Sequence, residues 1–429
     1  MEIKKIFETS NNGHYFFGYY DKSPLNKNNS KLLACKSTFI DKMPTKDDIL
    51  EIGYFEWKKS NEFIKITETK AWNWQQGCML QWLAPDYDKK IIYNDRIDDK
   101  FVTVIFDIES REKDILPMAY YTASNKGYFV LCIDNERHSF YRSGYSYKGI
   151  ENLSKKVPLL ENDGIWHIDI NTKKIKQIVT LKQMTETKPL SNMKNAIHYV
   201  EHLMISPDNK RFVFLHRWQT EDSGIYARLY TANVDGSDIY LLNDSGRISH
   251  YSWRNDTEIV AWGGLSNPIN SLRKYKNIVR FFIKPLMPLY KKLAGGNSVD
   301  GNTKLSAMVS GDSYIIFTDK SNKKRRLATD VLTKDGHPSF SKVNENLMIT
   351  DTYPNPKDEF KEELILFDMT KKEIVSSLKL NHLEEFASSA VRCDLHPKWS
   401  HDGKYVCIDT LSEERRGMSL YEIKDMKSE

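Results

Sequence analysis

The sequence predicts an all-β protein built as a seven-bladed β-propeller, and three observations lead to this prediction. A unit of two short apolar strands joined by a turn recurs seven times along the 429 residues. Several units continue into a third and a fourth strand, and four strands at a spacing of about 40–60 residues are typical of a propeller blade. The turns contain Pro-Asp-Asn or His-Asp-Gly, which suit tight hairpins. A pair of β-sandwiches is the alternative, but sandwiches do not repeat one signature seven times.

The repeats can be followed in order along the chain. The clearest copies are EHLMISPDNKRFVFLHRW at 201–218 and DLHPKWSHDGKYVCIDT at 394–410. The other first hairpins are expected at 16–38, 80–96, 119–134, 248–264 and 335–353. Third strands are expected at 164–174, 228–238, 363–373 and 418–425. The N-terminal segment EIKKIF should pair with the last blade, which would close the ring and remove an exposed sheet edge.

We therefore expect one propeller domain over 1–429, interrupted by an insertion at 265–312 in the fifth blade. Within it, 271–293 contains seven Lys and Arg and no acid, so its charge is +7 and the rest of the chain carries −2 (+5 minus +7). Basic residues mixed with apolar and aromatic ones are typical of segments that lie on anionic lipid. A lid, or a flank that packs on the propeller or on a second subunit, explains the pattern equally well. Contact with an anionic polysaccharide is a weaker alternative.

Composition restricts the environment and the partners. A net charge of +5 is mild for this length and indicates no nucleic-acid partner. We expect neither a secretory signal nor a transmembrane helix, because no apolar stretch has the required length. Five scattered cysteines, without the spacing of a metal site, indicate a reducing compartment. The predicted location is cytoplasmic, or peripheral on the inner membrane face through 271–293.

Histidine occupies the same position in four consecutive blades. The position lies five residues before the proline position of each first turn, near the upper end of the strand that lines the channel. Its occupants in blade order are Tyr19, Leu80, Tyr120, His202, His250, His337 and His396. With 11 His in 429 residues, seven such positions should contain only about 0.2 His. We expect the four imidazoles to converge at the channel mouth, where neutral histidine can act as a ligand, a base or a hydrogen-bonding group.

Other polar residues are expected around the same mouth. They come from the ends of second strands and from loops that enter the inner strands: Gln75, Gln76, Arg96, His216, Arg217, Asp351, Tyr353, Arg392, Asp394 and Asp409. The chain has no nucleophile elbow, P-loop, dinucleotide fingerprint or HExxH motif, so we expect no organic cofactor. Glycoside hydrolysis would need two of the three aspartates to flank the bond. β-Elimination beside a uronic acid needs Arg or a divalent cation to neutralise the carboxylate, and His or Tyr to remove the proton.

Several motifs resemble the oligogalacturonate-lyase family of polysaccharide lyases and its seven-bladed ulvan-lyase relatives. They are GHYFFGYYDKSP (13–24), SHYSWRND (249–256), DGHPSF (335–340) and the two clearest repeats. The resemblance extends over nearly the whole chain and is most specific from 198 to 410. It implies a carbon–oxygen lyase that cleaves uronic-acid-containing glycans by β-elimination. It also implies a manganese-type divalent cation held by histidines and a glutamine, with a separate His as base and an Arg that assists.

The resemblance assigns roles by position. His250, His337 and His396 become the metal-ligand candidates, His202 the base and Arg217 the partner of the substrate carboxylate. The substrate-binding candidates are Tyr19, Gln76, Arg96, Tyr120, Tyr353 and Arg392. The family's ligand glutamine has no counterpart, because Lys334, Asp335 and Gly336 precede His337. The ulvan-type relatives work through His, Tyr and Arg without a catalytic metal, and Tyr19, Tyr120 and Tyr353 keep that version open.

Two other functions fit the same mouth. One is a non-catalytic protein that binds or assembles glycans, with the histidines as hydrogen-bonding groups. The other is a different enzyme of envelope-polysaccharide synthesis, such as a glycosyltransferase, in which the basic insertion recruits a lipid-linked acceptor. The expected partner of the lyase is an acidic oligo- or polysaccharide.

Overall fold

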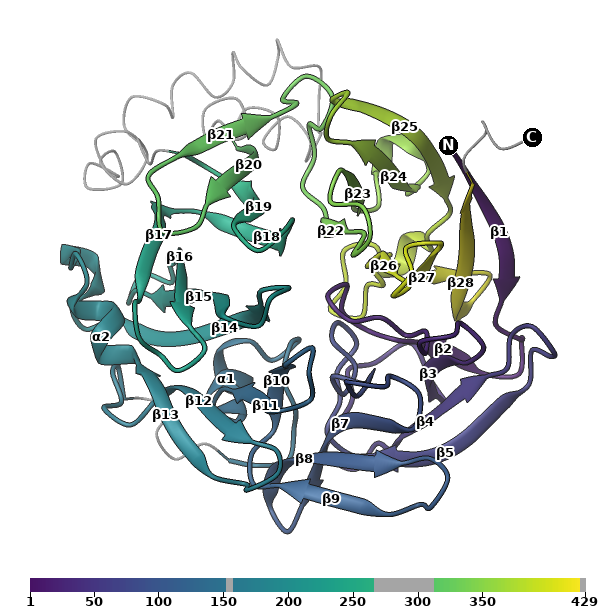
Figure 1. The fold of residues 1–429 in the computed structure, drawn as a ribbon, viewed down its shortest axis with the longest axis horizontal. Coiled ribbons are helices and arrows are strands. Elements are labelled where there is room, and N and C mark those ends of the chain that lie inside the picture. Colours follow the sequence, from purple (N-terminus) through teal and green to yellow (C-terminus); the bar gives the residue numbers. More distant parts are fainter. Residues whose placement is uncertain (152–156, 266–311, 425–429) are drawn as a thin grey trace.

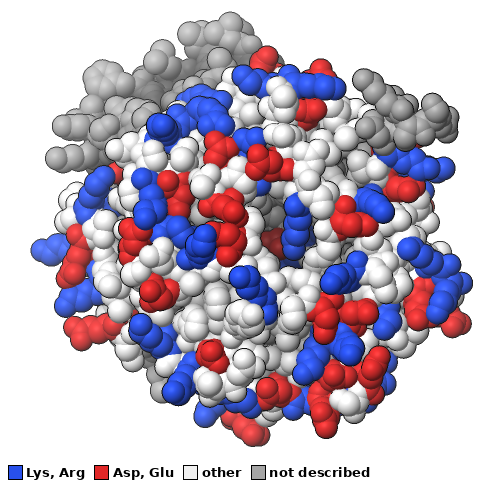
Figure 2. Space-filling model, viewed as in Figure 1, with Lys and Arg blue, Asp and Glu red and all other residues white. Residues whose placement is uncertain are grey.

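Seven four-stranded antiparallel sheets surround a central channel (Figure 1). The computed structural model describes residues 1–151, 157–265 and 312–424. Side chains of both charges surround the channel opening on the face shown in Figure 2. The predicted all-β seven-bladed propeller is therefore confirmed.

The first four blades are each formed by consecutive strands. Blade 1 contains β2 (His14–Phe16), β3 (Leu32–Ser37), β4 (Leu50–Phe55) and β5 (Phe63–Thr69). Blade 2 contains β6 (Gln81–Trp82), β7 (Lys90–Ile97), β8 (Lys100–Asp107) and β9 (Lys113–Leu116). Blade 3 contains β10 (Tyr120–Ala123), β11 (Phe129–Cys132), β12 (Gly164–Asp169) and β13 (Ile175–Thr180). Blade 4 contains β14 (Ile197–Ile205), β15 (Arg211–Gln219), β16 (Ile225–Asn233) and β17 (Tyr240–Gly246).

The last three blades complete the ring. Blade 5 contains β18 (Ile248–Trp253), β19 (Glu258–Gly263), β20 (Ser313–Thr318) and β21 (Lys324–Leu327). Blade 6 contains β22 (Ser339–Phe340), β23 (Leu347–Asp351), β24 (Glu362–Asp368) and β25 (Glu373–Leu380). Blade 7 contains β26 (Lys398–Trp399), β27 (Tyr405–Ser412) and β28 (Arg415–Lys424), with β1 (Glu2–Glu8) as its outer strand.

The N-terminal strand closes the ring as predicted. β1 runs antiparallel to β28, with Glu2 opposite Lys424 and Glu8 opposite Ser419. The two ends of the chain thus share one blade, and β28 has no free edge. Backbone hydrogen bonds between β1 and β28 therefore close the ring.

The middle strands of the blades form the core, because each sheet is packed between two neighbouring sheets. Four successive residues of β15, Phe212–Leu215, have no exposed surface, so both faces of this strand are buried. The outer strand β25 has no buried residue: four of its residues are exposed and four are half-buried. The first turns have the predicted chemistry, since Asn209 (φ 62°) and Gly403 (φ 70°) adopt the left-handed conformation that these residues tolerate.

The connection from β19 to β20 contains the predicted insertion. Of 265–312, only the two terminal residues are described, and 271–293 lies wholly outside the described residues. Two short α-helices, α1 (Asn135–Tyr141) and α2 (Leu181–Glu186), and three 3-10 turns, η1 (Ser191–Met193), η2 (Pro356–Asp358) and η3 (Glu384–Phe386), lie between strands. No helix of the described chain approaches the length and apolar character that a bilayer crossing requires.

Candidate functional site

The four histidines of blades 4 to 7 meet in the channel. The ring centroids of His250 and His337 are 4.2 Å apart, and those of His337 and His396 are 4.3 Å apart. His202 joins this group through Tyr19, whose ring stacks on His202 at 5.3 Å and meets His396 edge-on at 5.1 Å. Each histidine is at most 8% exposed. Equivalent positions of consecutive blades thus produce one continuous aromatic cluster.

Irregularities in the inner strands direct these side chains inward. The pairing of β14 with β15 shifts register between Glu201 and Met204, and His202 there has a φ of 57°. The pairing of β18 shifts in the same way between Ile248 and Tyr251, a stretch that includes His250. Such β-bulges interrupt the strict in–out alternation of a strand and re-aim side chains, often next to functional sites.

Two of the histidines are oriented by carboxylates. Asp351 lies 2.9 Å from Nδ1 of His337 and also accepts hydrogen bonds from the backbone N–H groups of His337 and His396. Asp335 lies 3.2 Å from Nδ1 of His250. A carboxylate on Nδ1 fixes the ring and leaves Nε2 as the electron-pair donor, as in carboxylate–histidine–metal arrangements. Burial lowers the pKa of His337, but Asp351 outweighs it and raises this pKa above the ordinary value.

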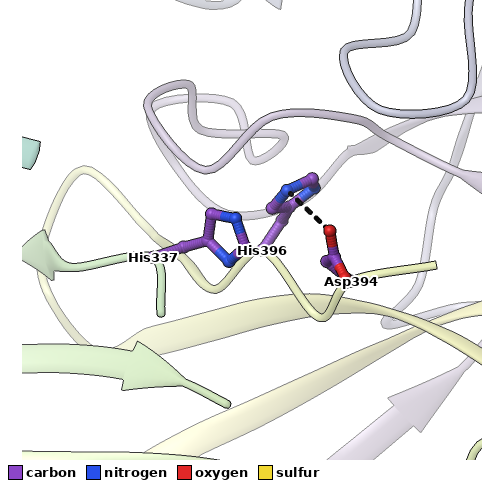
Figure 3. Close-up of side chains that lie close together, drawn as sticks. All are labelled: His337, Asp394 and His396. Atoms are coloured by element: carbon purple, nitrogen blue, oxygen red, sulfur yellow. Dashed lines mark ion pairs between the residues drawn. The ribbon is translucent and has the colours of Figure 1, made fainter. Parts of the chain in front are cut away.

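His337, His396 and Asp394 form a group that could hold a cation (Figure 3). One ligand atom from each residue lies within 4.8 Å of the others. Nε2 of His396 is buried without a hydrogen-bond partner, and it lies 4.0 Å from Asp394. Burial and the neighbouring His337 hold the pKa of His396 well below its usual range, so this ring is neutral.

The donor set fits a divalent transition metal. Neutral imidazoles with a carboxylate suit ions such as Mn²⁺, Fe²⁺ or Zn²⁺. A buried imidazole nitrogen without a partner loses hydrogen-bonding free energy unless something binds it. His250 lies beside His337 and can complete the set, so the residues present could hold the ion that the family resemblance implies.

A second group is centred on Glu201, which sequence reasoning missed. Glu201 is fully buried and forms ion pairs with Arg217 and with Nε of Arg142, the latter at 3.0 Å. His138 lies 3.2 Å from the same carboxylate. The short helix α1 carries His138 and is followed directly by Arg142, and its N-cap Asp134 accepts from the backbone N–H of Arg137. Burial opposes ionisation, but the two guanidiniums hold the pKa of Glu201 well below its usual range.

His202 stands between the Glu201 group and the tyrosines. Its Nδ1 lies 2.9 Å from the Tyr19 hydroxyl and 3.4 Å from the Tyr121 hydroxyl, and its Nε2 lies 3.6 Å from Glu201. Gln76 donates to the Tyr121 hydroxyl at 2.7 Å. Burial and the positive charges of Arg217 and Arg142, which outweigh Glu201, lower the pKa of His202 well below its usual range. The imidazole is therefore neutral, with one unprotonated ring nitrogen.

The structure brings most of the predicted mouth residues together. Those in the channel cluster or in direct contact with it are Tyr19, Gln76, His202, Arg217, His250, His337, Tyr353, Arg392 and His396. The guanidinium of Arg392 covers the Tyr353 ring at 4.6 Å and binds Asp394 through two hydrogen bonds of 2.6 and 3.0 Å.

Arg96 and Tyr120 lie elsewhere. Arg96 donates to the backbone carbonyl of Lys46 at 2.6 Å. Tyr120 is fully buried in the core between blades, with its hydroxyl on the carbonyl of Met79. The register of β10 shifts between Tyr120 and Thr122, and Tyr121, not Tyr120, reaches His202. Counting residues back from the turn cannot detect such a shift.

The charges of the cluster leave room for a cation. Three guanidiniums (Arg142, Arg217 and Arg392) and four carboxylates (Glu201, Asp335, Asp351 and Asp394) surround the histidines. With all four histidines neutral this amounts to −1, which would repel an acidic ligand; protonation of His337, whose pKa Asp351 raises, would bring the sum to 0. A bound divalent ion would change the sum to +1, and among buried side chains this difference strongly affects the binding of an anion.

Solved structures with the same architecture include two of oligogalacturonate lyases. The enzyme from Vibrio parahaemolyticus is 11% identical, with 99% of this chain and 97% of that chain covered and a TM-score of 0.59. An oligogalacturonate lyase in complex with manganese is 13% identical, with the same coverage and a TM-score of 0.58. At these identities the likeness establishes the fold alone, and it confirms the predicted resemblance at that level.

No family model matches the sequence. No curated protein matches it either.

Proposed function

We propose that this protein is a polysaccharide lyase that cleaves beside a uronic acid residue by β-elimination. The observation that carries the proposal is the meeting of four buried histidines from consecutive blades with a carboxylate-linked pair of arginines. The histidines can hold a cation, and the two arginines can hold a substrate carboxylate next to the neutral imidazole of His202. The oligogalacturonate-lyase fold supports the same reaction class.

The reaction needs three tasks from the chain. The uronate carboxylate must be neutralised so that the proton on the adjacent ring carbon becomes acidic. A base must accept that proton, and the bond to the glycosidic oxygen then breaks as a carbon–carbon double bond forms. The departing oxygen takes up a proton, so neither water nor an oxidant is consumed. We assign the base to His202, whose neutral ring is positioned by Tyr19, and the assisting cation to Arg217.

A divalent metal would be held by His337 and His396, with His250 or Asp394 completing the set. Such an ion neutralises the substrate carboxylate and stabilises the charge that develops on it. Asp335 and Asp351 would keep the His250 and His337 rings oriented toward it.

Glycoside hydrolysis is less well supported by the same residues. It would need one free carboxylic acid and one free carboxylate beside the bond. Asp351 is engaged by the His337 ring and by two backbone N–H groups. Asp409 accepts from the backbone of Phe17 and Gly18 and binds Lys398 at 3.0 Å. The hydrogen-bonding capacity of both is used within the protein.

The test is direct, because elimination creates an unsaturated uronate that absorbs in the near ultraviolet. The full chain is incubated with a panel of uronic-acid glycans, with and without Mn²⁺. We expect absorbance to rise with at least one substrate. Binding of a glycan without any rise would contradict the lyase and favour a binding or assembly protein.

Metal binding can be tested without a substrate. Protein purified without chelator should contain a transition metal by elemental analysis, and added Mn²⁺ should raise the melting temperature. A ligand at 100 times its Kd stabilises the folded state by about 2.7 kcal/mol. His396→Ala should remove both effects, whereas His167→Ala, outside the channel against Phe129, should retain them. If Mn²⁺ raised the melting temperature of both variants equally, the metal would bind at a site that does not include His396.

A further inference from the structure

The opposite end of the channel contains a second polar site, separate from the histidine cluster. It lies at the first turns of the blades, two to five residues further along the chain than the cluster position of each blade, or roughly 7–17 Å at ~3.3 Å per residue. Tyr20 and Tyr251 lie between the two ends: the Tyr20 hydroxyl donates to the Tyr251 carbonyl at 2.8 Å, and Tyr251 bonds the carbonyl of His202.

A cavity of about 60 Å³ lies at this end, where Asp21, Lys22, Ser23, Tyr87, Lys342 and His401 are among its lining residues. One buried water needs only about 10–15 Å³, so the cavity has room for a larger group. It shares much of its lining with a wider vestibule of about 500 Å³. A ligand could therefore enter from solvent without passing the histidines.

Three buried polar atoms that lack a hydrogen-bond partner belong to residues of this one cavity. They are Oδ1 of Asp21, Oγ of Ser23 and Nε2 of His401. Buried polar atoms are rarely left unsatisfied, and each costs about 1–3 kcal/mol when it is. Three around one space show that the cavity is polar and that something bound there, water or a ligand, must satisfy these atoms.

The charges show what the ligand must offer. Asp21 and Lys22 form an ion pair of 2.7 Å, with side chains only 6% and 4% exposed, and the Lys22 ammonium retains two further N–H donors. Lys342 is exposed at the rim, with its ammonium 5.8 Å from the centre of the Tyr87 ring, and it forms no ion pair with a carboxylate of the described residues. Burial and the nearby Lys342 lower the pKa of His401 to about 3, so its ring adds no charge. The cavity lining thus carries one excess positive charge and one carboxylate oxygen that needs a donor.

We propose that this end of the channel binds a small anion that also carries a hydroxyl group, the chemistry shared by hydrogen phosphate and a sugar acid. The negative oxygens face Lys22 and Lys342, and Ser23 and His401 complete the hydrogen bonds. The hydroxyl donates to Oδ1 of Asp21. The Asp21 carboxylate makes the site selective. An anion without a hydroxyl group, such as sulfate, would place an unprotonated, negatively charged oxygen against it.

Calorimetric titration of the full chain tests the proposal with four probes: inorganic phosphate, sulfate, D-galacturonate and neutral D-galactose. We expect phosphate, galacturonate or both to bind at least ten times more tightly than sulfate and galactose. Binding of phosphate alone identifies a phosphate source, and binding of galacturonate alone identifies a sugar acid. Galacturonate that binds at the histidine cluster instead is recognised because its affinity is unchanged in Lys342→Met.

Lys342→Met should weaken this binding at least tenfold. Lys126→Met is the matched control, since it removes the same charge from an exposed residue in the first turn of blade 3, and Lys126 does not line the cavity. Asp21→Asn should reduce the preference for phosphate over sulfate, because an amide can donate to sulfate. The proposal would be overturned if sulfate bound as tightly as the better of phosphate and galacturonate, if no anion bound, or if binding were unchanged in Lys342→Met.

Discussion

Replacing His202 with asparagine should lower the rate of uronate elimination by about 10²–10⁴-fold, the usual contribution of a general base. Asparagine is the preferred substitution because His202 has a φ of 57°, a conformation in which Asn and His are both enriched. Asparagine cannot accept the proton, yet it retains a polar group for Tyr19. Initial rates are measured by ultraviolet absorbance at saturating and at low substrate concentration.

The control is His167→Ala, which removes an imidazole from blade 3 that stacks on Phe129 at 4.7 Å. Its rate should equal that of the wild type. Tyr19→Phe should lower kcat by a smaller factor, because it removes only the hydroxyl that positions Nδ1 of His202. A rate within a few-fold of wild type in His202→Asn, with the fold intact, would assign the base to another residue.

The architecture could be predicted because its signal is local and repeated. Each first hairpin has its own turn residues, and seven copies fix the number of blades without any long-range information. The pairing of β1 with β28 could also be predicted, because without it the last blade would have an exposed sheet edge. Position-by-position equivalence of blades then brought His250, His337 and His396 together correctly.

The parts of the site that escaped prediction depend on departures from that regularity. Tyr121 replaces Tyr120 because one extra residue shifts the register of β10. Arg142 comes from the connection between β11 and β12, which follows no repeat, so only folding places it on Glu201. One signal in the sequence could have identified Glu201. It is an acidic residue next to the predicted base His202, within a strand whose other residues are mostly buried.

Replacing Glu201 with glutamine should destabilise the fold by about 3 kcal/mol, toward the lower end of the values for broken buried ion pairs. Glu201 is fully buried, whereas Arg142 is 24% and Arg217 14% exposed, so water partly screens the two charges left behind. The free energy of unfolding is obtained from urea titration at pH 7. Adding Arg142→Gln to Glu201→Gln should recover part of the loss, because only one unpaired guanidinium then remains.

The pH dependence distinguishes this charge effect from a change in packing. The pKa of Glu201 lies well below 4.5 in the folded protein, so its contribution to stability is complete above about pH 4.5 and is lost as the pH falls. The difference between wild type and Glu201→Gln should therefore be full at pH 7 and become smaller in acid. Glu68→Gln, at a surface pair with Lys65 in which both side chains are about half exposed, should change stability by less than about 1 kcal/mol. A Glu201→Gln loss as small as that of Glu68→Gln would show that the two arginines do not need this carboxylate.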